Sequence, residues 1–438
     1  MDSIRKSLKA IVACSIAAWL VLGATSAFAQ GMYFKEIEKD GRIYVFNIQA
    51  NAERFEKTGE MGVSITMPGS GPNGETVIGD NEKALQLYYY KHNLQVVVPD
   101  PPPPPATALP WRISGLVFGD YYYFADSSQA AFEKQHGLWI RRGYFTYDHT
   151  FSPAVTTRFR LEVNSNGRMA GGSLTPYVKD LYMRWTYYGR QQLTIGIQPT
   201  LTFEFIENFW GLRHIEKTPL DLYRVDSSRD VGFTAAGPIN TSGSLRYGYQ
   251  FGNDASQNSE TDKYKAQRAV FRFEKNPGFS VEGFWGHFDR NPTPTPATTP
   301  ADRETAQVFV GYRNPKARLG FQYTFQRREA ADNAAPTVQD VDLNIYSGFG
   351  VFEMPRQKVS FYARVDRVND PCADCAAIDY FPAAANAPFT TTIAGMEYYI
   401  LPSVRIGPNI EYVAFSDPTS GAKPKNTSIA RFTFYWVW

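Results

Sequence analysis

The amino-acid sequence predicts an all-β protein, a sixteen-stranded antiparallel transmembrane β-barrel, preceded by a small α+β domain. Three observations predict the barrel. Apolar and polar side chains alternate from about residue 111 to the end, the alternating runs are long, and the connections between runs are alternately long and tight. The 27 Tyr, 31 Phe and 34 Gly among 438 residues also favour strands over helices.

The alternation has a period of two. Phe159 and Leu161, for example, alternate with Arg158 and Arg160. Successive side chains of a strand point to opposite faces, so each run has one apolar and one polar face. Since lipid leaves no backbone polar group unpaired, a spanning sheet must close with its apolar face outward. We expect this lipid-facing set to include the apolar positions of 158–163, 181–187, 245–251, 319–326, 341–345 and 432–438.

The length of the runs separates this barrel from a soluble sheet. Most runs have about 10–14 residues, against about 5–6 for a typical strand and about 9–11 for a tilted membrane-spanning strand. The odd-numbered connections are long, with the longest at about 200–229, whereas the even-numbered ones are tight. Outer-membrane barrels, which have an even strand number, show this asymmetry. A soluble β-sandwich or propeller, the alternative, is not expected to show it.

The chain before the barrel divides into three predicted segments. Residues 1–29 combine a basic start, an apolar stretch and a small-residue cleavage site, as a secretory signal peptide does, although an N-terminal anchor helix is the alternative. Residues 30–98 follow a ββαββα pattern in which Asn81 caps the second helix, and we expect a small periplasmic α+β domain. Residues 99–110 are rich in proline and form a stiff linker to the barrel at 111–438.

Charge and cysteine content exclude several classes of protein. With 45 basic and 43 acidic residues, the chain lacks the basic excess of a dedicated nucleic-acid binder. Zinc usually requires four ligands, whereas Cys372 and Cys375 stand in a long connection without a nearby His, so we expect a disulfide between them. The five His are scattered and no hydrolase motif is found. We therefore expect no enzyme, no cofactor and no metal.

Three segments give the barrel a family resemblance. Residues 138–145 (LWIRRGYF), 220–224 (LDLYR) and 229–233 (RDVGF) resemble the phosphate-selective porin O/P family of outer-membrane porins. The resemblance covers about 111–438 and implies a passive channel in the bacterial outer membrane, assembled as a homotrimer. In porins the loop after the fifth strand folds into the barrel and narrows it. The resemblance therefore places the pore constriction at about 200–229.

This loop and the polar faces of the strands supply the expected pore residues. The loop carries Arg213, Lys217, Arg224 and Arg229 together with Glu207 and Asp221. The alternation adds six wall residues from five strands, namely Arg158, Arg160, Arg184, Arg246, Arg318 and Arg364.

The mixed signs of these charges leave the selectivity open. A ring of arginines attracts anions, because guanidinium stays charged and pairs with oxyanions. Carboxylates share the same faces, so a weak anion preference, general diffusion of small hydrophilic solutes and phosphate specificity are all compatible with the sequence. A structural or docking barrel is the alternative function. Its lumen would be blocked, and its periplasmic domain would bind peptidoglycan or an envelope partner.

Overall fold

The computed structural model describes residues 33–92, 94, 109–164, 173–188, 190–259, 263–289, 302–330, 340–370, 372, 374–375 and 378–438. The predicted signal peptide and residues 99–108 of the linker lie outside the described residues. The chain divides into two compact units, residues 1–107 and 108–438. No helix among the described residues is long and apolar enough to cross a membrane.

The first unit has the ββαββα order that the sequence predicts. Its elements are β1 (Lys35–Lys39), β2 (Arg42–Phe46), α2 (Gln49–Thr58), β3 (Ile65–Met67), β4 (Thr76–Gly79) and α3 (Glu82–Lys91). The sheet has the order β1-β2-β4-β3, in which only β2 and β4 are parallel. Asn81 caps α3, since its side chain accepts a hydrogen bond from the backbone N–H of Ala84 at 3.0 Å. Leu85, Tyr88 and Tyr89 of α3 are buried against the sheet.

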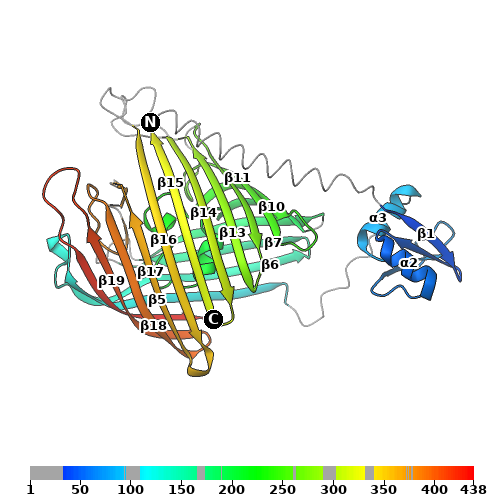
Figure 1. Cartoon of the computed structure of the whole chain (residues 1–438), viewed down its shortest axis with the longest axis horizontal. Helices are drawn as coiled ribbons and strands as arrows, with labels where there is room; N and C mark the ends of the chain where they lie inside the picture. The colour runs from blue at the N-terminus through cyan, green and yellow to red at the C-terminus, as the bar shows by residue number, and fades with distance from the viewer. Residues whose placement is uncertain are drawn as a thin grey trace. The chain divides into compact units, whose positions relative to one another are not determined.

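The second unit is a closed antiparallel barrel of sixteen strands, which confirms the predicted fold (Figure 1). Each strand pairs with its neighbour in sequence, and β20 closes the ring on β5, as where Phe432 pairs with Tyr121. The strands are β5 (Trp111–Asp126), β6 (His136–Ser152), β7 (Val155–Asn164), β8 (Thr175–Tyr187), β9 (Gln191–Pro199), β10 (Arg229–Pro238), β11 (Leu245–Gly252), β12 (Ala266–Glu274), β13 (Gly278–Phe288), β14 (Asp302–Asn314), β15 (Ala317–Glu329), β16 (Val341–Met354), β17 (Val359–Val368), β18 (Phe389–Leu401), β19 (Val404–Phe415) and β20 (Thr427–Val437).

The connections differ between the two ends of the barrel. At one end the strands are joined by tight turns, such as 153–154 and 402–403, and a 3-10 turn, η2 (Pro355–Gln357), closes another. At the other end the connections are long. They include a 3-10 turn, η1 (Ala130–Phe132), and two short helices, α4 (Glu204–Trp210) and α5 (Pro219–Leu222).

The outer face of the barrel is apolar and the inner face is mostly polar. Phe321 and Leu138 are 53% and 79% exposed, whereas the inward-facing Gln326 and Arg268 are fully buried. One run departs from the prediction. Leu343 and Ile345 of β16 were expected to face lipid, but they lie inside the barrel, each 1% exposed. They face inward because apolar loop residues fill this side of the lumen.

Candidate pore constriction

The loop between β9 and β10, residues 200–228, lies inside the barrel and is called here the inner loop. In α4 the apolar residues Phe205, Ile206, Phe209 and Trp210 form one face, as the helical spacing requires. Phe209 packs edge-on against Phe309 of β14, with ring centroids 5.1 Å apart. Trp210 packs against Phe349 of β16 at 5.1 Å. Apolar contacts therefore hold α4 to the β14–β16 side of the wall, and the rest of the lumen stays on the opposite side.

Four buried arginines of the wall hold the loops in place, and they are called here the anchor arginines: Arg141, Arg268, Arg364 and Arg431, each at most 4% exposed. Arg141 donates to the carbonyl of Ile215 at 2.9 Å, and Arg364 donates to the carbonyl of Lys217 at 2.6 Å. Arg268 binds the carboxylate of Asp226 through two donors at 2.7 and 2.8 Å.

One of the anchor arginines, Arg364, is a predicted pore residue that has a different role in the structure. The sequence predicts that Arg364 lines the pore, but its side chain is buried between the wall and the inner loop, where it pairs with Asp366. Arg364 is a positioning residue, because it acts on the pore only through the loop that it holds.

A second loop, residues 369–388 between β17 and β18, is called here the disulfide loop, and those of its apolar residues that the structure describes pack inside the barrel. Cys372 and Cys375 form a disulfide with Cα atoms 5.2 Å apart, and both cysteines are buried. The Sγ atoms lie 4.0 Å from the carbonyl oxygen of Tyr223 in the inner loop. Asp379 pairs with Lys217 at 3.0 Å. Apolar residues of both loops, such as Tyr223 and Phe381, also belong to one buried cluster with Leu343 of β16. This cluster narrows the lumen on the side of β16.

On the other side of the inner loop, the described residues enclose a larger and a smaller cavity. The larger, of about 380 Å³, lies between the inner loop and the strands β5–β8, β10 and β20. Its cationic strand residues are called here the basic wall: Arg142, Arg158, Arg160, Lys179 and Arg229. The smaller cavity, of about 250 Å³, is lined by Arg184, Arg246 and Arg272, and Pro199 and Glu204 border both cavities.

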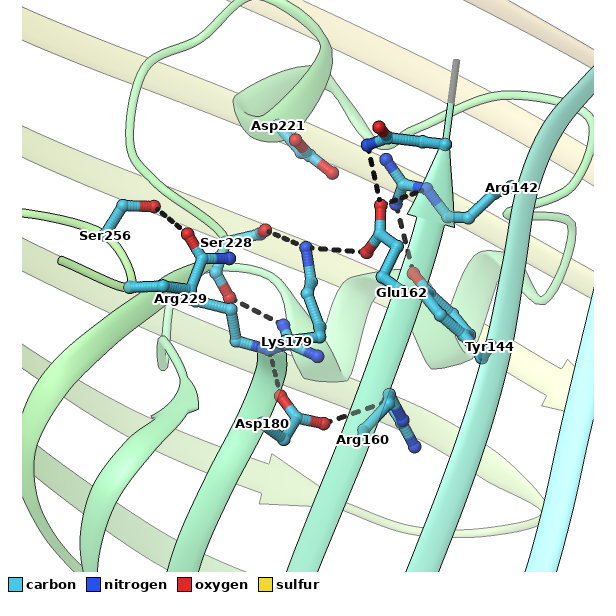
Figure 2. Close-up of polar contacts among 12 residues, drawn as sticks. Arg142, Tyr144, Arg160, Glu162, Lys179, Asp180, Asp221, Ser228, Arg229 and Ser256 are labelled. Carbon is cyan, nitrogen blue, oxygen red and sulfur yellow. Dashed lines mark hydrogen bonds and ion pairs between the residues drawn. The ribbon is translucent and has the colours of Figure 1, made fainter. Parts of the chain in front are cut away.

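Carboxylates that lie behind the basic wall hold its cations in place (Figure 2). Glu162 pairs with Arg142 at 2.9 Å and with Lys179 at 3.1 Å. Asp180 pairs with Arg160 at 3.1 Å and also with Arg229. Both carboxylates are fully buried, whereas their cationic partners line the cavity. The cations are exposed to the cavity and the carboxylates are not. The surface that a solute meets is therefore more positive than the net charge of this part of the wall.

The inner loop contributes the acidic side of the constriction. Arg213 pairs with Glu207 at 3.0 Å and with Asp221 at 3.2 Å, and all three line the larger cavity. Burial disfavours the charged form of Asp221 and would by itself raise its pKa. The positive charges of Lys217 and Arg213 have the larger effect and lower the pKa of Asp221 below its usual value. Burial would likewise lower the pKa of Lys217, whereas Asp221 and Asp379 raise it above the usual value. These pairs fix the loop in its charged form.

The other predicted pore residues occupy different positions. Arg158, Arg160, Arg213, Arg229, Glu207 and Asp221 line the larger cavity, and Arg184 and Arg246 line the smaller. Arg318 pairs with Glu353 at 3.2 Å and lines neither cavity. Lys217 is buried between the two loops, and Arg224 is exposed at a residue with left-handed backbone, φ 56°.

Two β-bulges explain which luminal residues the alternation misses. The pairing of β5 with β6 shifts between Phe118 and Gly119, and that of β7 with β8 shifts between Arg160 and Leu161. A bulge inserts an extra residue and turns the next side chains toward the other face. As a result Arg141 lies inside together with Arg142, and Lys179 lies inside together with Asp180. The sequence contains no signal that marks these bulges.

Glu207 gives the constriction a predicted response to pH. Burial raises the pKa of Glu207, although Arg213 acts in the opposite direction. Since a raised pKa means that the carboxylate is neutralised earlier on acidification, Arg213 is then less compensated. We expect the permeability to anions relative to cations to rise on acidification, starting above the pH of about 4.3 at which an unperturbed Glu is half protonated. The measurement is the reversal potential in a KCl gradient. In Glu207→Gln this pH response should be smaller, and an unchanged response would contradict the assignment.

The closed ring of sixteen strands with a long loop folded inside has the architecture of a porin. No protein-family model matches the sequence, and no curated protein matches it in a sequence search. Solved porin-like structures do match the fold. OmpF of Salmonella typhi, in a complex with daunomycin, is 10% identical with a TM-score of 0.55, and the match covers 75% of this chain and 97% of OmpF.

Two further structures match over the same share of the chain. The outer-membrane channel DcaP of Acinetobacter baumannii is 12% identical with a TM-score of 0.51, and 97% of it is covered. A loop-deletion mutant of OmpT, an outer-membrane protein of Vibrio cholerae, is 13% identical with a TM-score of 0.51, and 99% of it is covered. At these identities the likeness shows the fold alone. The resemblance to the phosphate-selective O/P family stays a hypothesis.

Proposed function

We propose that the protein is an outer-membrane porin that forms a passive, water-filled channel for small hydrophilic solutes. The observation that carries the proposal is the pair of polar cavities beside the inner loop, inside a barrel whose outer face is apolar. An apolar outer face suits contact with lipid, and a charged interior suits a path for water and ions.

A weak preference for anions follows from the arrangement of charge. The buried carboxylates Glu162 and Asp180 lie behind the cations that line the larger cavity. In the smaller cavity, Arg184 and Arg246 have no carboxylate partner among the described residues, whereas Arg272 pairs with Glu282 at 2.5 Å. Specificity for phosphate, which the family resemblance would imply, has no further support, since acidic groups of the inner loop border the same space.

The assembly and orientation form part of the same proposal. In outer-membrane barrels the tight turns face the periplasm. Trp111, where the chain enters the barrel, lies at the tight-turn end, which favours a periplasmic location for residues 30–98 and a role as an envelope-facing domain after removal of residues 1–29. A homotrimer is expected because OmpT of Vibrio cholerae, one of the proteins of similar fold, has been solved in a trimer form.

Planar-bilayer recording tests the channel directly. The mature chain should give stepwise current increments that grow with KCl concentration, and the reversal potential in a KCl gradient should have the sign of anion preference. A docking barrel closed by the inner and disulfide loops would give no steps, and this result would contradict the proposal. Cation preference would leave the channel in place and overturn only the anion preference.

A further inference from the structure

We propose that the larger cavity is a binding site for an organic anion, a small molecule with one oxyanion head and a flat apolar body. The inference rests on the proposed channel function, because the cavity borders the constriction through which a solute would pass. Its volume of about 380 Å³ falls within the range of about 300–1,000 Å³ typical of small-molecule sites.

The basic wall supplies the site for the oxyanion head. Arg160 donates through Nε to the hydroxyl of Thr146 at 2.9 Å and pairs through Nη1 with Asp180, so neither contact uses Nη2. Arg158 binds Asp148 through Nε and Nη2 at 2.7 and 3.0 Å, so Nη1 is not used. Side chains that are already held in place lose less rotational freedom when an anion binds, and guanidinium donors match the geometry of a carboxylate or phosphate.

Acidic groups border the site, but most are already neutralised. Glu207 and Asp221 both bind Arg213, which also lines the cavity. Glu204 is exposed and lies at the edge shared with the smaller cavity, on the side of Arg229 and away from the β6 and β7 cations Arg142, Arg158 and Arg160, none of which it pairs with. The four cations of the basic wall that lie on β6–β8, namely Arg142, Arg158, Arg160 and Lys179, therefore remain the dominant charges on that side of the cavity.

Aromatic and aliphatic side chains line the same cavity and supply a surface for the apolar body. They are Leu116 of β5, Tyr144 of β6 and Tyr435 of β20, all half-buried. The guanidinium of Arg160 lies 5.1 Å from the ring centre of Tyr144, so a cation and an aromatic face occur side by side. His214 stacks on Tyr435 at 4.3 Å and lines the cavity as well. Flat rings favour stacking with a planar apolar group.

The basic wall and the apolar rings together distinguish between classes of small molecule. Inorganic phosphate or acetate can use the basic wall but not the rings, whereas an aromatic carboxylate can use both. A neutral aromatic amide can use only the rings. The geometry therefore predicts that benzoate binds more tightly than acetate, phosphate or benzamide.

Block of the chloride current by these four probes tests the site. We expect benzoate to reduce the current saturably, at a concentration about tenfold lower than acetate, phosphate or benzamide requires, because one additional contact surface gives a difference of this order. Equal block by benzoate and acetate, or a current that benzoate never saturates, would overturn the proposal.

Two variants separate the head from the body. Arg160→Gln should weaken block by benzoate and by acetate about tenfold, and Asp180 keeps Arg229 as a partner in this variant. Tyr435→Leu should weaken block by benzoate and leave block by acetate unchanged. Arg190→Gln, in an exposed tight turn, is the matched control and should change neither.

Equilibrium binding keeps the test independent of channel activity. Calorimetric titration of the detergent-solubilised full chain with benzoate should show saturable binding that Arg160→Gln weakens. If bilayers show no channel while calorimetry shows this binding, the proposed function fails and the site stands. If channels form and benzoate neither binds nor blocks, the site fails and the channel stands.

Discussion

Replacing Arg141 by methionine is expected to destabilise the barrel by about 3–5 kcal/mol, because it leaves a buried carboxylate without its cation. Arg141 Nε pairs with Asp120 at 2.7 Å, and both side chains are fully buried. The same guanidinium donates to the carbonyls of Ile215 at 2.9 Å and of His214 at 2.5 Å. The substitution therefore breaks the ion pair and two contacts that hold the inner loop.

The measurement is the temperature at which the detergent-solubilised barrel loses its compact, heat-modifiable band on a gel. Arg158→Met is the matched control, since Arg158 and Asp148 are 29% and 33% exposed, and pairs of this kind contribute only about 0–1 kcal/mol. The double variant Arg141→Met with Asp120→Leu should recover part of the loss, because no unpaired charge remains. An effect of Arg141→Met no larger than that of Arg158→Met would show that Arg141 does not anchor the loop.

The same contacts show why the sequence could predict the barrel but not the path through it. The period-two alternation follows from strand geometry, so strand number and connection asymmetry could be predicted from local patterns. The alternation tells that a run has two faces, but not which face meets lipid. For β16 the apolar Leu343 and Ile345 lie inside, because the apolar residues of the inner and disulfide loops cover them.

The disulfide loop is a second case in which a local pattern was insufficient. The lack of further zinc ligands near Cys372 and Cys375, together with their expected place outside the cell, predicts a disulfide, and the structure contains it. Its burial beside Tyr223 depends on the contact between two loops far apart in the sequence. No periodicity marks a loop that folds into a lumen, so the sequence could not show that this loop narrows the pore together with the inner loop.

Bulges limited the prediction of the charged lining in the same way. A strict alternation puts Arg142 inside but puts Arg141 and Lys179 outside, whereas the register shifts bring both into the lumen. Arg141 then donates a hydrogen bond to the backbone of the inner loop, and Lys179 lines the larger cavity. Residue type alone could not separate arginines that hold the loop from arginines that face the solute. Burial and the identity of the acceptor make this distinction.

Reversing the charge of Arg184 and Arg246 together is expected to change the sign of the ion selectivity. Both line the smaller cavity, and neither has a carboxylate partner among the described residues. Arg184→Glu with Arg246→Glu therefore replaces two positive by two negative charges without leaving a buried carboxylate unpaired. Because selectivity in a narrow pore follows the charge of its lining, cations should then pass more easily than anions.

The reversal potential in a KCl gradient measures this change. Arg190→Glu is the matched control, since it makes the same substitution at an exposed tight turn where Arg190 donates to the carbonyl of Thr241 at 2.9 Å. The control should keep the wild-type sign. The difference in reversal potential between the double variant and the wild type should shrink near 1 M salt. At this concentration the Debye length falls to about 3 Å, and charges on the wall no longer act at the centre of the pore. A double variant that stays anion-preferring at low salt would show that ions do not pass the smaller cavity, and the path would then have to lie elsewhere in the lumen.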